Sequence, residues 1–220
     1  GTALLFVLVK FHKINLWKAW FFLSVFVCLT FAFGAFVGDI IAAGAALVFA
    51  LLKIYRPNVV VHNFTELFLY GGLAAIFVPI LNLPAIVILL VMISVYDAFA
   101  VWKSKHMITL AKFQTKAKMF AGLSIPYALN KPLFPEFGAG GKRKSQPTAA
   151  ILGGGDIAFP LLFAGVVMKQ VGFLESLVVP LFASLALLVL LIYGRKGKFY
   201  PAMPFFSIGC ALGYAAVLLI

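Results

Sequence analysis

The sequence predicts an all-α fold, a polytopic bundle of membrane-spanning helices, and three observations lead to this prediction. Of the 220 residues, 64% are hydrophobic and only 11% are charged, whereas a soluble domain has an apolar share near one half. The apolar residues gather in runs close to the roughly 20 that a helix needs to cross a bilayer. The basic residues, which give a net charge of +12, fall in the segments between those runs. They are therefore expected to set membrane topology. The expected partner is the lipid bilayer, and binding of nucleic acid is not expected.

The apolar runs predict seven spans. In chain order these lie at 19–37, 40–52, 64–81, 84–102, 149–168, 171–193 and 201–220. The run at 40–52 is short, and Asp39 precedes it where a capping side chain would lie. A further apolar stretch at 1–9 is expected to be the tail of another helix.

The distribution of Lys and Arg predicts the orientation of the spans. Of the 18 basic residues, all but Lys169 lie in alternate loops, at 10–18, 53–56, 103–148 and 194–200. Positive charge accumulates in the cytoplasmic loops of membrane proteins. These loops are therefore expected in the cytoplasm, with the carboxyl terminus outside.

The longest connection divides the chain into three predicted regions. Residues 1–106 form an amino-terminal group of helices, and residues 149–220 form a carboxyl-terminal group of three. Between them, residues 107–148 are expected to begin as an imperfect basic amphipathic helix at the membrane surface. They continue into a flexible loop rich in Pro, Gly and Lys, which is either a solvated linker or a gate over a site.

Only two of the six acidic residues are predicted to lie deep within a span. The other four are near turns, loops or helix starts, where water or the interface can solvate them: Asp39, Glu66, Glu136 and Glu175. Asp97 stands six residues before Lys103, about 9 Å from the end of its helix. Asp156 stands eight residues after Thr148, about 12 Å from the start of its own. A carboxylate at that depth is costly and indicates a function.

The two deep aspartates, Asp97 and Asp156, are both expected in the cytoplasmic half of the membrane, on helices that run in opposite directions. They could therefore face each other. Two carboxylates a few ångströms apart share one proton, because both cannot easily ionise. One can then activate a water while the other donates to a carbonyl oxygen. This chemistry needs no cofactor or metal, and the three histidines are too scattered toward loops to form a metal cluster: His12, His62 and His106. The alternative is an ion- or proton-coupled transporter or leak channel that uses the same buried aspartates.

A run of glycines precedes the second of these aspartates. Gly153, Gly154 and Gly155 remove the side chains from the turn before Asp156. Another backbone can then approach closely, or the helix can loosen, since glycine weakens a helix by about 1 kcal/mol relative to alanine.

A pair of prolines marks the start of the last span, on the same side of the membrane. Pro201 and Pro204 bracket Ala202 and Met203. Two residues without backbone N–H groups are tolerated at membrane depth only where the backbone lines a cavity or packs on protein.

Three motifs in this order on three spans resemble those of the presenilin and signal peptide peptidase family, the GxGD intramembrane aspartyl proteases. They are Tyr96-Asp97, Gly153-Gly154-Gly155-Asp156 and Pro201-Ala202-Met203-Pro204. The resemblance implies a presenilin-like fold, with nine spans in the family and seven to eight in this chain. It also implies transmembrane-helix substrates, catalysis by the two aspartates, active-site support by Tyr96 and the glycines, and substrate docking beside 201–204.

Two residues depart from the family pattern. Met203 stands where leucine is usual, a near-isosteric exchange that should preserve activity. Gly154 stands where leucine is common, which should make the active-site turn more flexible. The orientation and the proline after Met203 favour the presenilin branch, and the compact loops favour an archaeal homologue. Natural substrates and oligomeric state are not predicted.

Overall fold

The computed structural model describes residues 14–56, 58–102, 121–126, 149–193 and 201–219, which form two compact units. The first unit consists of Gly1–Leu73 and Ile108–Gly154, and the second of Ala74–Met107 and Gly155–Ile220. The predicted helix tail at 1–9 and most of the predicted amphipathic helix and loop at 107–148 lie outside the described residues.

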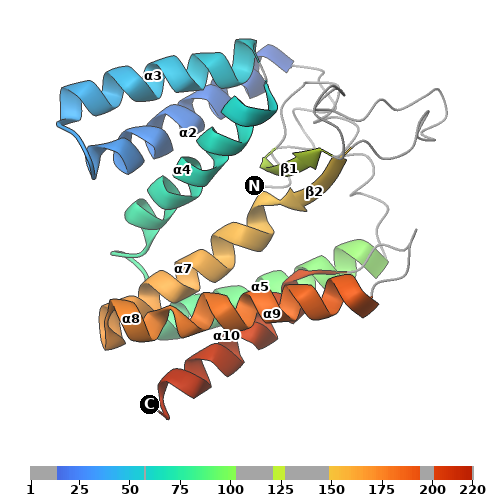
Figure 1. Cartoon of the computed structure of the whole chain (residues 1–220). Coiled ribbons are helices and arrows are strands. Elements are labelled where there is room, and N and C mark those ends of the chain that lie inside the picture. Colours follow the sequence, from blue (N-terminus) through green and yellow to red (C-terminus); the bar gives the residue numbers. More distant parts are fainter. Residues whose placement is uncertain (1–13, 57, 103–120, 127–148, 194–200, 220) are drawn as a thin grey trace. The chain divides into compact units, whose positions relative to one another are not determined.

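Helices make up most of the described chain (Figure 1). In chain order they are α2 Ile14–Gly34, α3 Asp39–Tyr55, α4 Val59–Phe77, α5 Leu83–Trp102, α7 Gly154–Val171, α8 Phe173–Ser176, α9 Val178–Tyr193 and α10 Met203–Val217. Five helical segments in this part of the chain are long and apolar enough to cross a membrane, and α10 is apolar but shorter. On α5 the large side chains of Ile88, Val91, Met92 and Val95 are exposed, as lipid-facing residues would be.

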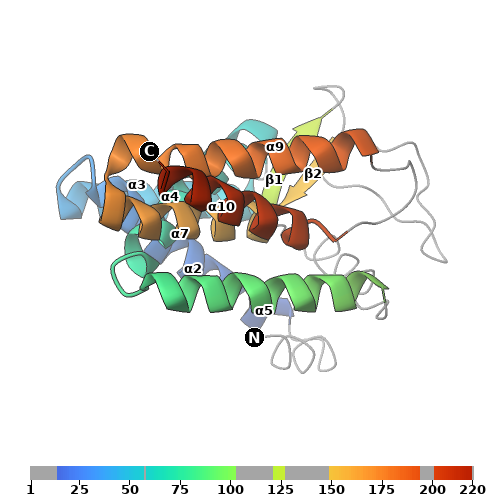
Figure 2. The same ribbon diagram turned by 90° about the horizontal axis from the view of Figure 1, so that it is seen from below.

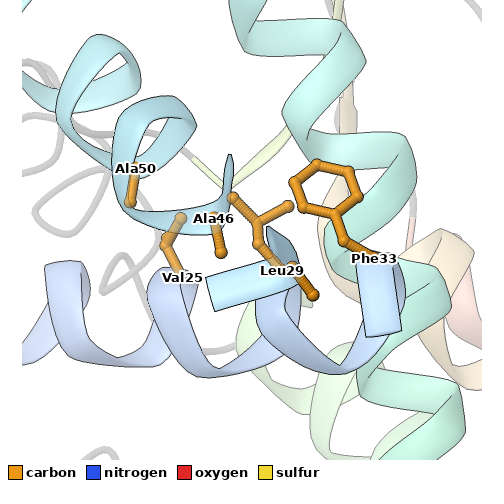
Figure 3. Close-up of a cluster of buried hydrophobic side chains, with 6 residues drawn as sticks. Val25, Leu29, Phe33, Ala46 and Ala50 are labelled. Carbon is orange, nitrogen blue, oxygen red and sulfur yellow. The ribbon is translucent and has the colours of Figure 1, made fainter. Parts of the chain in front are cut away.

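In the first unit, α2 and α3 pack together through small and large residues spaced four apart. Figure 3 shows Val25, Leu29 and Phe33 of α2 close to Ala46 and Ala50 of α3. All five are buried. Alanines on one face of a helix let the neighbouring backbone come close, which is how membrane helices gain contact without a hydrophobic drive between them.

The start of α3 differs from the sequence prediction. Gly38 occupies the cap position and makes no side-chain hydrogen bond, while Asp39 is the first helical residue. Asp39 therefore does not cap the helix. Its carboxylate lies in the first turn instead, where the helix dipole favours negative charge.

Helix α4 approaches α2 at one glycine. A methyl group added to Gly72 would overlap the backbone carbonyl of Cys28, whereas one added to the adjacent Gly71 would meet open space. Gly72 is thus the residue whose lack of a side chain permits the close approach.

A two-stranded antiparallel sheet completes the first unit (Figure 1). Strand β1, Gly122–Pro126, pairs with β2, Ala149–Gly153, so that Gly122 lies opposite Gly153 and Pro126 opposite Ala149. The predicted span at 149–168 is therefore wrong for its first five residues. A short apolar run does not distinguish a strand from a helix by periodicity, and here β1 supplies the backbone partners that a helix would otherwise provide.

In the second unit, α10 contacts both α9 and α5 (Figure 2). Gly209 and Gly213 of α10 lie against the α9 backbone: a methyl group on Gly213 would come within 2.8 Å of Val179 Cα.

Lys169, the one basic residue outside the alternating loops, also has partners in the second unit. The Lys169 ammonium donates to the carbonyl oxygens of Val78, Pro79 and Leu81 at 3.0, 3.2 and 3.2 Å.

Candidate active site

The Asp97 carboxylate lies at the start of α10. Asp97 is half-buried on α5, five residues before the helix ends at Trp102. The backbone N–H of Met203, the first residue of α10, donates to Asp97 Oδ2 at 3.1 Å. The first N–H groups of a helix have no partner within the helix, and the positive end of the helix dipole favours a carboxylate there. This contact joins the Tyr-Asp motif to the Pro-Ala-Met-Pro motif.

A second polar contact aligns the same two helices. The hydroxyl groups of Ser94 and Ser207 lie 2.6 Å apart. Ser94 precedes Asp97 by three residues and Ser207 follows Met203 by four, so the two contacts are one helical turn apart on each helix. They fix the rotation of α10 relative to α5.

The prolines around Met203 limit the hydrogen bonds available at this position. Pro201 and Met203 are buried, while Ala202 and Pro204 are half-buried. Neither proline has an N–H to donate. The Met203 N–H lies between them, where it can bind a carboxylate.

Asp156 lies at the junction of a strand and a helix, in the first turn of α7, and it is half-buried. The prediction of a continuous helix from Thr148 to Asp156 is therefore wrong, since residues 149–153 are extended and α7 begins only at Gly154. The glycines mark this junction and do not weaken a helix interior. Near the N-terminus of a helix, negative charge is favoured by the dipole, which gives a physical reason for an acid at this position.

The three glycines of the second motif lie in different surroundings. Gly153 pairs with Gly122 across the sheet. Gly154 is buried, and its N–H donates to the Ala121 carbonyl at 3.2 Å. A methyl group on Gly154 would lie 2.9 Å from the Tyr70 hydroxyl oxygen, whereas one on Gly155 would touch only the ring of its own helix neighbour, Phe159, at 3.6 Å. The tight position is thus Gly154.

The structure places the first motif's tyrosine away from the packed interior. The Tyr96 side chain is 55% exposed on α5. Asp97, Asp156 and residues 201–204 all belong to the second unit. Within the described residues, no group of three His, Cys, Asp or Glu side chains could hold a metal ion.

A buried ion pair in the first unit was not predicted from the sequence. Glu66, expected to be solvated, is 0% exposed, and Lys53, expected to be a loop charge, is 4% exposed. Lys53 Nζ lies 2.6 Å from Glu66 Oε1. His62, expected toward a loop, is likewise buried, and its Nε2 lies 2.8 Å from the Gly122 carbonyl oxygen. The sequence feature that could have indicated this ion pair is the opposite charge of Lys53 and Glu66, which lie on two helices joined by one short turn.

Comparisons with known proteins agree with the predicted family and fold. Residues 4–220 match the family described as signal-peptide peptidase, presenilin aspartyl protease. No curated protein sequence matches the chain. Among the similar solved structures, two are described as a presenilin family intramembrane aspartate protease, in space groups C222 and P2. The first has a TM-score of 0.64 at 22% identity and covers 98% of this chain and 79% of its own.

The second solved structure has a TM-score of 0.62 at 20% identity, over 99% of this chain and 82% of its own. At these identities the likeness shows a shared fold, which confirms the predicted presenilin-like bundle of membrane helices. The family match covers nearly all of the chain. The chain is therefore a multi-pass integral membrane protein that belongs to the signal-peptide peptidase and presenilin aspartyl protease family.

Proposed function

We propose that this protein hydrolyses peptide bonds of transmembrane helices, with Asp97 and Asp156 as the catalytic residues of a GxGD-type aspartic endopeptidase. The observation that carries the proposal is the 3.1 Å hydrogen bond from the Met203 N–H to Asp97. It connects two of the three family motifs in the unit that also contains Asp156. Family membership supports the same assignment.

In the proposed reaction one carboxylate is ionised and the other is protonated. The ionised group takes a proton from water, whose oxygen attacks the carbonyl carbon, while the protonated group donates to the carbonyl oxygen. As the gem-diol intermediate collapses, the C–N bond breaks and the leaving nitrogen receives the proton that was taken from water, while one hydroxyl group returns its proton to the carboxylate that had donated it. No covalent intermediate, metal or cofactor is required.

The substrate must lose its helical hydrogen bonds around the scissile bond, because the helix shields that bond. The freed backbone groups need new partners inside the membrane. An added strand beside β2 is one source, since within the described residues β2 pairs only with β1 and ends three residues before Asp156. The alternative is the segment 201–204, and strand addition of this kind is a general mode of peptide recognition.

We also propose that the basic loops lie in the cytoplasm and the carboxyl terminus outside, in the membrane of an archaeal cell. The distribution of Lys and Arg supports this orientation. The one exception, Lys169, donates to three carbonyl oxygens at the turn between α4 and α5. Its charge therefore has a structural partner and does not argue against the proposed topology.

Cleavage and ion flux, measured on the same liposomes, test this function against a transporter. The purified chain is reconstituted with a single-span peptide, and products are identified by mass spectrometry alongside a flux dye. We expect peptide products from the unmodified chain and from Asp39→Asn, an exposed acid used as control, and none from Asp156→Asn. Ion flux that depends on Asp156, with no peptide product from any form, would favour the transporter instead.

A further inference from the structure

A buried polar network in the first unit has no part in the proposed chemistry. Lys53 Nζ of α3 lies 2.6 Å from Glu66 Oε1 and 3.2 Å from Thr65 Oγ1, both on α4. The one hydroxyl hydrogen of Thr65 is within reach of two backbone carbonyls of its own helix, those of Val61 at 2.8 Å and His62 at 2.9 Å. His62 Nε2 then reaches the Gly122 carbonyl of β1 at 2.8 Å. The network therefore connects α3, α4 and the sheet.

The chemistry of the last contact fixes the role of the imidazole. A backbone carbonyl oxygen only accepts hydrogen bonds, so Nε2 of His62 must carry the hydrogen and donate it. His62 is 3% exposed. A buried carbonyl group without a donor destabilises the fold by more than a hydrogen bond to it stabilises the fold, because the group has also lost its hydration. The histidine therefore holds β1 at one defined residue.

That residue lies opposite the glycine motif. Gly122 pairs with Gly153 in the sheet, and the neighbouring Ala121 carbonyl accepts the N–H of Gly154 at 3.2 Å. Gly122 has a φ of +154°, a conformation that other residues rarely adopt. His62 thus binds the carbonyl of the β1 residue that lies opposite Gly153. Asp156 follows Gly154 by two residues.

From this connection we infer that His62 is a positioning residue: it fixes the register of β1 against β2, and through β2 it fixes the chain that leads into Asp156. The inference rests on the proposed function, because it concerns the placement of a catalytic aspartate. A slip of one residue would move β2 by about 3.3 Å along its partner and would turn its side chains to the opposite face. A misplacement of only about 1 Å at a reacting group can lower a rate about 100-fold.

The test compares His62→Leu, which cannot donate, with His62→Gln, whose side-chain amide can. Two readouts are needed, and the first does not depend on activity: hydrogen exchange of the Gly154 amide in the full chain in detergent. We expect exchange to quicken about fivefold in His62→Leu, as for one lost hydrogen bond, and to stay near that of the unmodified chain in His62→Gln. Unchanged exchange in His62→Leu would overturn the inference.

The second readout is the cleavage of a single-span peptide, as kcat, KM and the positions of the cut bonds. We expect His62→Leu to lower kcat by about 10- to 100-fold or to shift the cut positions, with little change in KM and with recovery in His62→Gln. Val25→Ala, in the α2–α3 core, is the control for a purely structural effect. It should lower thermal stability and leave the cut positions unchanged.

The combined outcomes separate this inference from the proposed function. Quickened exchange with unchanged kcat and cut positions would reduce His62 to a structural residue and overturn its positioning role. If instead Asp97→Asn and Asp156→Asn cleave as the unmodified chain does, the proposed function fails, and the catalytic part of this inference fails with it. In that case the exchange data would still report whether His62 anchors the strand.

Discussion

The buried ion pair between Lys53 and Glu66 allows a quantitative test of how the first unit is held together. Both side chains are removed from solvent, with 2% and 0% exposure, and the charged atoms lie 2.6 Å apart. At an effective dielectric constant of about 20, two unit charges at that distance attract by about 6 kcal/mol. Much of this attraction offsets the hydration that both groups lose. Glu66 Oε2 has no hydrogen-bond partner within the described residues, so the compensation is incomplete.

Removing one partner should therefore cost far more than removing both. Lys53→Met and Glu66→Leu each leave a buried charged group without its partner, and each should lower the free energy of unfolding by about 3–5 kcal/mol. The double variant Lys53→Met/Glu66→Leu removes both charges and should lie within about 1 kcal/mol of the unmodified chain or above it. Asp39→Asn, an exposed acid, should change stability by no more than about 1 kcal/mol.

Reversible unfolding in mixed micelles, with increasing SDS, measures these differences as a double-mutant cycle. A coupling energy of several kcal/mol is expected. Single variants that cost less than about 1 kcal/mol, as exposed pairs do, would refute the reasoning that the pair is desolvated. Additive losses in the double variant would refute the direct interaction between the two groups.

Three further predictions use contacts within single units. Gly72→Ala should lower the free energy of unfolding by about 3 kcal/mol, because the added methyl group would overlap the backbone of Cys28. The adjacent Gly71→Ala should be neutral or raise the free energy of unfolding by up to about 1 kcal/mol. Equal effects of the two variants in the same SDS titration would contradict the packing of α2 on α4. Lys169→Met should cost about 2 kcal/mol through its lost bonds to three carbonyls, and a thermal-melting midpoint equal to that of the unmodified chain would show that these bonds contribute nothing. Ser94→Ala and Ser207→Ala should couple by about 1 kcal/mol in a double-mutant cycle, and zero coupling would mean that the two hydroxyls do not interact.

Most of the helical architecture was predictable from the sequence, because membrane spans are governed by length and hydropathy alone. The apolar runs located α3, α5 and α10 to within three residues at each end and α2 and α4 to within five, whereas the run at 171–193 covers both α8 and α9. The strand at 149–153 was missed for a physical reason: its apolar residues fit a helix equally well, and the choice depends on β1, a segment far away in the chain.

The motif residues of the candidate site could be singled out from the sequence, but the contacts between them could not. Asp97 and Met203 were singled out by motif, yet the bond between the Met203 N–H and Asp97 depends on where α10 begins. Glu66 and Lys53 were misjudged because position near a helix end suggests solvation, while burial depends on how α3 and α4 pack. His62 was missed because its partner is a backbone carbonyl, which no side-chain pattern reveals.

Non-additivity of the two aspartates tests the central claim most directly. The measurement is the initial rate of peptide product formation in liposomes by the unmodified chain, Asp97→Asn, Asp156→Asn and the double variant. If the two carboxylates act as one unit, each single variant should lose about 100- to 10,000-fold in rate, and the double variant should be no slower than either. A single variant that cleaves at the unmodified rate, or a double variant whose loss is the product of the two single losses, would contradict the account.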